Sequence, residues 1–146
     1  MKREYKNSRY AGEMLVAAEL ARLGFEVMLG NIGKHHTEHF DLAAACPVTG
    51  VISGISVKSL KAPNVFLIDP ERVLAPAVYV FIITGGTGAL PQFFVVRGKQ
   101  LLADERRFWG KWGRTYKQAS RRGIGHKDLA EFKDNWAALD TAKRTS

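Results

Sequence analysis

A short apolar segment, VYVFIIT at residues 78–84, places the strongest constraint on what this chain can fold into. Its β-branched and aromatic side chains favour a strand. Neither face of this strand is polar, so it is stable only where other elements cover both faces of its sheet. We therefore expect an α/β fold, with this strand in the interior of a mixed sheet that is flanked by helices.

Hydrophobic periodicity predicts the elements around this strand. A helix is expected over residues 8–23, where Ser8 can cap the first turn and Gly24 can end it. Two more helices are expected near the end of the chain, over 99–112 and over 128–139, the second capped by Asp128. The expected strands are 25–29, 38–45, 51–59, 78–84 and 92–96, joined by loops at 30–37 and 114–126.

The two strands at 38–45 and 51–59 form the best-defined hairpin. Their connection, Pro-Val-Thr-Gly at 47–50, is a typical turn sequence. Strict alternation would place Glu38, Phe40 and Leu42 on one face of the first strand, and His39, Asp41 and Ala43 on the other. If the hairpin pairs, Asp41 and Lys58 can share a face of the sheet.

Size and composition indicate one globular domain spanning 1–146. The chain has 146 residues, of which 46% are hydrophobic and 25% charged, and no linker divides it. The ends, 1–7 and 140–146, are expected to fray. Cys46 is the single cysteine, which excludes an internal disulfide and suits a cytoplasmic protein. The longest apolar run, 75–83, is too short to span a membrane, and no signal peptide precedes it.

Positive charge is concentrated in one region of the chain. Residues 97–127 carry ten Lys and Arg against two Asp and Glu, a local charge of +8 that equals the net charge of the whole chain. Such an excess is typical of a surface that binds a polyanion, and nucleic acid is the partner that it favours. A solvated basic face and an anionic membrane surface are the alternatives.

Three charged residues stand where a plain core would not place them. Glu13 lies on the apolar stripe of the first helix, Asp41 lies within an apolar strand, and Lys58 lies near the end of the return strand. Carboxylate oxygens suit Mg²⁺, and a lysine can steady a water molecule and offset charge that develops on phosphate. The alternatives are that Glu13 favours the helix dipole, and that Asp41 and Lys58 form a cross-strand ion pair.

Three short motifs carry a resemblance to a known family: Gly-Glu at 12–13, Phe-Asp-Leu at 40–42 and Ile-Ser-Val-Lys-Ser at 55–59. In this order they resemble the PD-(D/E)XK nuclease superfamily, especially its small Holliday-junction-resolvase-like members. The resemblance implies a restriction-endonuclease-like αβββαβ core and metal-dependent hydrolysis of phosphodiester bonds, with Mg²⁺ or Mn²⁺ as cofactor. It also implies that Glu13, Asp41 and the Val57 carbonyl hold the metal, and that Lys58 is the catalytic lysine.

The chain departs from the family pattern at Ser56, where the family usually has Glu, Asp or Gln. A neutral hydroxyl is a poor Mg²⁺ ligand, so a second interpretation stays open: a catalytically inactive nuclease fold that binds DNA or RNA. A third is a protein-interaction domain with incidental charge. Branch-cutting relatives are commonly dimers, which makes a homodimer an expectation by analogy.

Contacts to nucleic acid are expected from the basic loop and from polar residues near the motifs. The candidates are His39, Ser56, Arg114, Lys117, Arg121, Arg122 and Lys127. For His39, a phosphate contact is one interpretation, a zinc site with His35 a second, and a solvated loop histidine a third.

Overall fold

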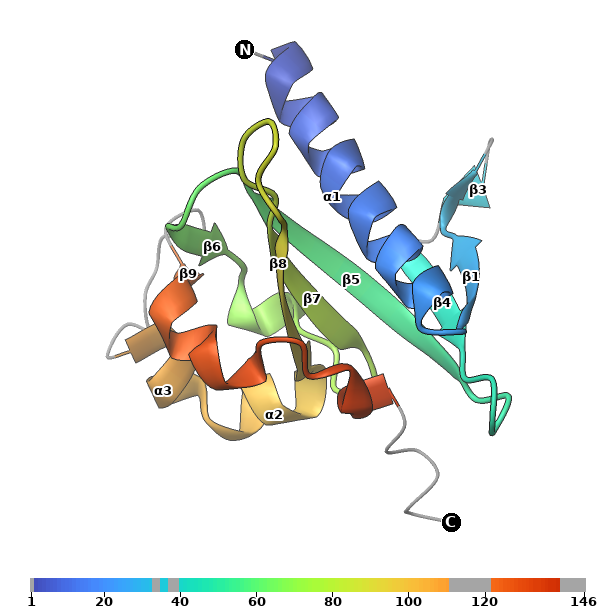
Figure 1. The fold of residues 1–146 in the computed structure, drawn as a ribbon. Helices are drawn as coiled ribbons and strands as arrows, with labels where there is room; N and C mark the ends of the chain where they lie inside the picture. Colours follow the sequence, from blue (N-terminus) through green and yellow to red (C-terminus); the bar gives the residue numbers. More distant parts are fainter. Residues whose placement is uncertain (1, 33–34, 37–39, 111–121, 140–146) are drawn as a thin grey trace.

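The apolar segment forms strand β7 (Val78–Ile83), all six residues of which are buried. Figure 1 shows this strand in a computed structural model of the chain, which describes residues 2–32, 35–36, 40–110 and 122–139. For 2–8, 31–32 and 35–36 the backbone alone is described. Strand β7 lies between β5 (Ile52–Leu60) and β8 (Gln92–Arg97), which confirms its interior position in the sheet.

The main sheet has five strands in the order β1-β4-β5-β7-β8. Strand β1 (Glu26–Leu29) pairs antiparallel with β4 (Leu42–Ala45), and β4 pairs antiparallel with β5. Strands β5 and β7 are parallel, whereas β7 and β8 are antiparallel. The predicted mixed sheet and the predicted hairpin at its centre are therefore confirmed.

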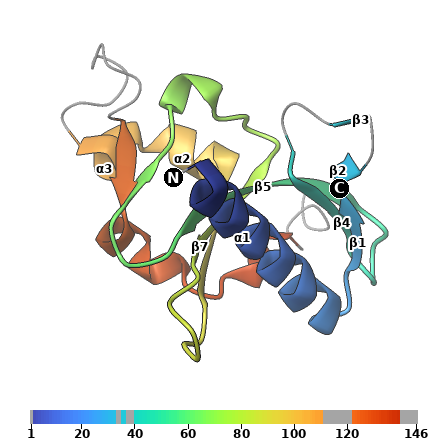
Figure 2. The same cartoon turned by 90° about the horizontal axis from the view of Figure 1, so that it is seen from above.

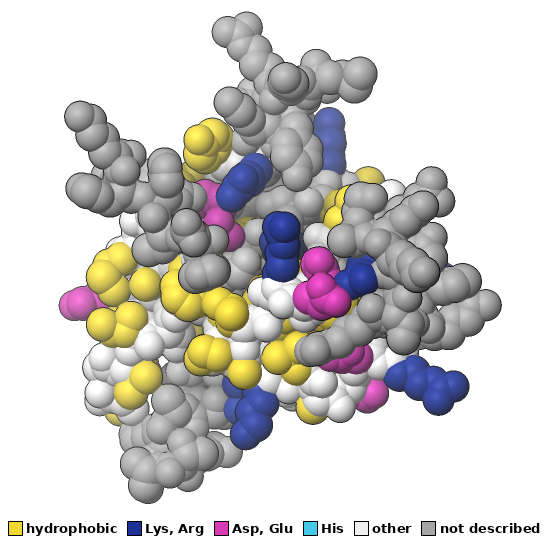
Figure 3. All heavy atoms as spheres, turned by 180° about the vertical axis from the view of Figure 1, so that it is seen from behind, with side chains coloured by type: hydrophobic (Ala, Val, Ile, Leu, Met, Phe, Trp, Pro, Cys, Tyr) yellow, Lys and Arg dark blue, Asp and Glu magenta, His cyan; other side chains and the backbone are white. Residues whose placement is uncertain are grey.

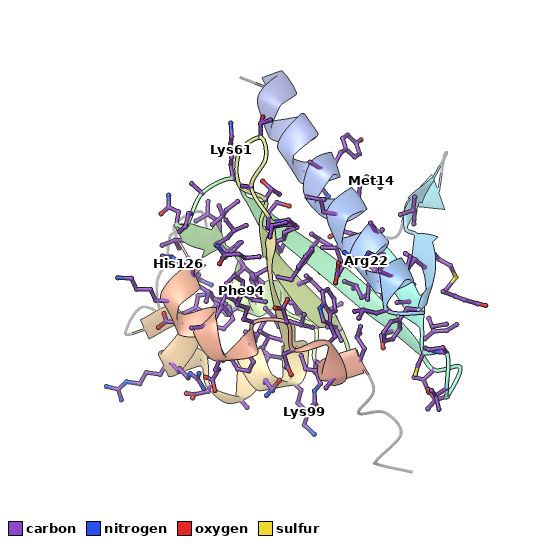
Figure 4. The ribbon with its side chains drawn as sticks, in the orientation of Figure 1. Met14, Arg22, Lys61, Phe94, Lys99 and His126 are labelled. Atoms are coloured by element: carbon purple, nitrogen blue, oxygen red, sulfur yellow. The ribbon has the colours of Figure 1, made fainter. Side chains whose placement is uncertain are left out.

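Helices cover both faces of this sheet, as the apolar strand requires (Figure 2). On one face, Val16 and Leu20 of helix α1 (Lys2–Arg22) pack against β4, β5 and β7. On the other face lie α2 (Gly98–Ala103), α3 (Glu105–Trp109) and the 3₁₀ helix η4 (His126–Phe132). Phe94 of β8 points into this second interior, as Figure 4 shows.

The connection from β5 to β7 contains no α-helix; residues 61–77 are all described. It carries strand β6 (Val65–Leu67) and the short 3₁₀ helix η1 (Pro70–Arg72) in place of the helix that an αβββαβ core implies. Strand β6 pairs with β9 (Gly123–Gly125), in a stretch expected to be a loop. Two strands of three residues are too short for periodicity to reveal.

Several predicted helix boundaries are wrong. Helix α1 begins at Lys2, so Ser8 is not its cap and the backbone of residues 2–7 is helical. The helix expected over 99–112 is divided at Asp104, which has φ −138° and ψ 58°. Residues 2–7 contain no Gly or Pro, which is why the helix can continue through them.

The C-terminal helix expected over 128–139 is also wrong in type. It consists of η4 and a second 3₁₀ helix, η5 (Trp136–Leu139), separated by Asp134 at φ 53°. An α-helix cannot pass through a residue with positive φ.

The expected loop at 30–37 contains a small pair of strands, β2 (Asn31–Ile32) and β3 (His35–His36).

Candidate active site

Asp41 lies at a break in the alternation of the chain before β4. Phe40 packs with the core on the α2 and α3 side of the sheet, whereas Leu42 packs with the core beneath α1. The alternation that put these two residues on one face was therefore wrong. The Asp41 N–H donates to the carbonyl of Ile55, the residue paired with Leu42, so residues 41 and 42 both stand opposite Ile55. This two-to-one pairing is a β-bulge, a device that redirects a side chain.

The bulge directs the Asp41 carboxylate toward strand β5. Its Oδ2 accepts a hydrogen bond from the backbone N–H of Val57 at 2.7 Å. In an extended strand the N–H and C=O of one residue point to the same neighbour. The Val57 carbonyl therefore points toward the side on which Asp41 lies, as its implied role as a metal ligand requires.

Glu13 reaches the same place from helix α1, and it is 4% exposed. The helix can come this close because residue 12 is glycine. A Cβ built on Gly12 would lie 1.8 Å from Ser59 Oγ and 2.9 Å from Ser59 Cβ, so α1 rests directly on β5 at this point. Gly12 thus sets the height of Glu13 above the sheet.

Arg9 joins the two carboxylates. Its Nε lies 3.3 Å from Glu13 Oε1, and its Nη2 lies 3.6 Å from Asp41 Oδ1. Sequence reasoning missed Arg9, although it stands four residues before Glu13, the spacing at which side chains on a helix meet. The structure therefore brings Glu13 and Asp41 together, with a guanidinium between them.

Burial raises the pKa of the Glu13 carboxyl above its ordinary value, and the negative charge of Asp41 raises it further. Arg9 opposes both effects in part. In the metal-free protein, an ionised Glu13 is consequently an unfavourable group for the folded state. Between the ordinary and the raised pKa the folded chain holds a proton that the unfolded chain has lost, so stability falls as pH rises through this interval.

Replacing Glu13 by Gln is therefore expected to stabilise the metal-free protein at pH 7, by roughly 0.5–2 kcal/mol. The gain should disappear at pH 4 and below, where Glu13 is itself protonated. Urea unfolding at both pH values, with a chelator present, measures the difference. Glu19→Gln, which removes a surface partner of Arg22 on the same helix, is the matched control. A Glu13→Gln variant less stable than the wild type at pH 7 would contradict the expectation.

Lys58 is half-buried on β5, one residue after Val57. Burial lowers the pKa of its ammonium group below the ordinary value, Asp41 raises it in part, and Arg9 and Arg72 lower it further. Asp41 thus acts electrostatically on both Glu13 and Lys58. A lysine with a lowered pKa can exchange a proton more readily than one in solvent.

Ser56 is 8% exposed and lies beside Tyr79 in the register of β5 and β7. Its position in the interior explains how a small neutral residue is tolerated there, but it contributes no carboxylate to the site.

Among the described residues, no three His, Cys, Asp or Glu side chains gather closely enough to hold a metal ion. The oxygens of Glu13, Asp41 and Val57 nevertheless fit Mg²⁺, which is usually held by one or two carboxylates and keeps several waters.

The predicted nucleic-acid contacts have different outcomes. Arg114, Lys117, Arg121 and His39 lie outside the described residues, so the expectations about them, zinc included, stay predictions. Lys127 is exposed. Arg122 is 8% exposed, and its Nη1 lies 2.9 Å from Asp69 Oδ1. Because this guanidinium is buried in an ion pair, we do not retain it as a surface contact.

On the face seen in Figure 3, the described basic side chains do not form one continuous patch. The Lys and Arg side chains in Figure 3 stand apart from each other, and some lie next to Asp or Glu. Much of the basic region falls within 111–121, outside the described residues.

No helix in the described parts of the chain has the length and apolar character needed to cross a membrane.

Comparison with known proteins shows the fold. No protein-family model matches the chain, and no curated protein matches it in sequence. Among solved structures, it is similar to a bacterial homing endonuclease, I-Ssp6803I, with a TM-score of 0.58 and 15% sequence identity over 97% of each chain. The fold is therefore restriction-endonuclease-like, as the motifs predicted.

Proposed function

We propose that this protein is a metal-dependent endonuclease that hydrolyses phosphodiester bonds of DNA. The observation that carries the proposal is the meeting of Glu13 and Asp41, from two elements far apart in the chain, beside Lys58. Support also comes from a fold that resembles a homing endonuclease over nearly the whole chain. Paired carboxylates can hold a divalent cation, and a lysine can offset negative charge that develops on phosphate.

In this proposal each residue has a definite task. Glu13, Asp41 and the Val57 carbonyl hold a divalent cation, which when bound polarises the phosphate and lowers the pKa of water. The Val57 N–H fixes the orientation of Asp41 through its 2.7 Å hydrogen bond. Lys58 would steady the attacking water, and its ammonium group would offset the negative charge that develops on the phosphate. Its half-buried position keeps that ammonium group close to the site rather than in solvent.

The basic region between 97 and 127 would hold the DNA backbone. Of the predicted contacts, Lys127 is exposed in the structure, and His39, Arg114, Lys117 and Arg121 are proposed on sequence alone. Ser56 is 8% exposed, so a phosphate contact through its hydroxyl is proposed on sequence alone. Cleavage of both strands of a duplex would need two active sites, which a homodimer would supply.

Supercoiled and branched DNA, incubated with the full-length protein and Mg²⁺ or Mn²⁺, test the proposal. The wild type is expected to nick or cut, and chelation should stop the reaction. Asp41→Asn keeps the shape of the side chain but removes its charge, so it should lower the cleavage rate about 10²- to 10³-fold, the loss typical for one preorganised electrostatic group. Equal cleavage by Asp41→Asn and the wild type would show that the activity arises elsewhere.

A second function is favoured by one observation. Ser56 offers a buried neutral hydroxyl where a carboxylate is usual, so the site has one acidic group fewer. The alternative is a nuclease fold that binds DNA or RNA without cutting it. Binding that weakens steeply with salt, combined with no cleavage in either metal, would support this alternative over the endonuclease.

A further inference from the structure

We propose that Arg9 occupies the cation position of the site in the metal-free protein, and that a divalent cation must displace it. This inference rests on the proposed metal site. It concerns what fills that site before the metal arrives, and it assigns to Arg9 a role as an internal competitor of the metal.

The first observation is which carboxylate oxygens Arg9 faces. Asp41 Oδ2 accepts a hydrogen bond from the Val57 N–H, whereas Asp41 Oδ1 faces Arg9. Arg9 Nη2 lies 3.6 Å from that Oδ1, and Arg9 Nε lies 3.3 Å from Glu13 Oε1. The guanidinium therefore stands against one oxygen of each proposed metal ligand.

The second observation is that both positions cannot be filled together. Mg²⁺ binds carboxylate oxygens at about 2.0–2.1 Å and keeps a shell of waters around it. A hydrated dication between Glu13 and Asp41 would overlap the guanidinium and repel its charge. Arg9 and the metal should consequently exclude each other.

The third observation is the difference in burial. The side chains of Glu13 and Asp41 are 6% and 14% exposed, whereas that of Arg9 is 61% exposed. The carboxylates are held in the fold, while Arg9 reaches in from solvent on a long flexible stem. Arg9 can therefore leave at small cost, since exposed ion pairs are weak.

The arrangement also has a use in the absence of metal. Glu13 and Asp41 are two adjacent carboxylates in a largely buried place, and their negative charges repel each other. Arg9 offsets this repulsion, because its guanidinium lies against an oxygen of each carboxylate. The guanidinium thus keeps the carboxylates together until a divalent cation replaces it.

Binding of Mn²⁺ to the full-length protein without DNA tests this inference by calorimetry. Arg9→Gln keeps much of the length of the side chain and removes its charge, so it should bind Mn²⁺ about three- to tenfold more tightly than the wild type, the range expected for loss of exposed ion pairs. Arg9→Lys retains one charge and should remain nearer the wild type. Arg22→Gln, at the other end of α1 (Figure 4) and paired with Glu19, should bind like the wild type.

Thermal unfolding gives a second readout that does not depend on activity. Without metal, Arg9→Gln should melt at a lower temperature than the wild type, because the carboxylates lose their counter-charge. Its gain in melting temperature on addition of Mn²⁺ should be larger than that of the wild type. Asp41→Asn should remove the gain in melting temperature both in the wild type and in Arg9→Gln. This result would place the ion at this site.

The results distinguish this inference from the proposed function. Mn²⁺ binding by Arg9→Gln that is equal to or weaker than that of the wild type would overturn the inference and leave the nuclease proposal intact. Tighter binding without any cleavage of DNA would support the role of Arg9 while rejecting the nuclease. Absence of Mn²⁺ binding by both proteins would overturn the two proposals together.

Discussion

Replacing Lys58 by alanine is expected to lower the rate of DNA cleavage about 10²- to 10⁴-fold, the usual contribution of a positioned general acid or base. The Lys58 side chain is half-buried and interacts electrostatically with Asp41. An exposed lysine elsewhere on the surface therefore cannot take over its role. Affinity for DNA should change little, because the basic region between 97 and 127 has a local net charge of +8, equal to that of the whole chain. Single-turnover cleavage and DNA binding, measured on the same preparation, separate the two effects.

Two further variants sharpen this expectation. Lys58→Arg keeps the positive charge but cannot release a proton, so cleavage near the level of Lys58→Ala would indicate proton transfer rather than simple charge. Lys61→Ala removes an exposed lysine just beyond the end of β5 (Figure 4) and should leave the rate unchanged. If Lys58→Ala and Lys61→Ala cleave equally fast, Lys58 has no part in the reaction.

Replacing Gly12 by alanine is expected to destabilise the protein by about 1–3 kcal/mol, the usual cost of overpacking. Alanine is the better helix former, so a helix free of close contacts would instead gain about 1 kcal/mol. The sign differs here because the new Cβ would meet both the Oγ and the Cβ of Ser59. Helix α1 must then move away from β5 and carry Glu13 with it, so Mn²⁺ affinity should fall as well.

The matched control is Gly86→Ala, because a Cβ at Gly86 would meet nothing within 4 Å. Its stability should stay within about 0.5 kcal/mol of the wild type. Ser59→Ala removes the nearer of the two clashing atoms, so the double variant Gly12→Ala with Ser59→Ala should recover part of the lost stability. Denaturant unfolding of the wild type, Gly12→Ala, Gly86→Ala and the double variant provides the comparison. A stabilised Gly12→Ala variant would refute the close approach of α1 to β5.

Much of the fold was predictable from local patterns. The apolar run of β7 required a sheet covered on both faces, and the turn at 47–50 joined β4 and β5 as expected. Both signals depend on residues close together in the chain, where periodicity and turn chemistry act directly. The pairing of β6 with β9 was missed because it joins two three-residue strands from distant parts of the chain.

The candidate site was predicted in its members but not in its geometry. Glu13, Asp41 and Lys58 stood out as charged residues in apolar surroundings. Alternation then placed Phe40 and Leu42 on one face, whereas they pack into the cores on opposite faces of the sheet because of the bulge opposite Ile55. A bulge adds one residue to one strand, and its position depends on the partner strand rather than on the sequence around Asp41.

The sequence by itself determined the fold class, the interior position of β7 and the identity of the charged residues that a core would not choose. It did so because burial and chain alternation are local properties that residue types record directly. Only the tertiary structure decided that Arg9 stands between Glu13 and Asp41, and that Arg122 is buried beside Asp69 rather than free for DNA. The contacts of Arg9 with Asp41 and of Arg122 with Asp69 join residues far apart in the chain, which meet only because α1 and the β5–β7 connection pack where they do.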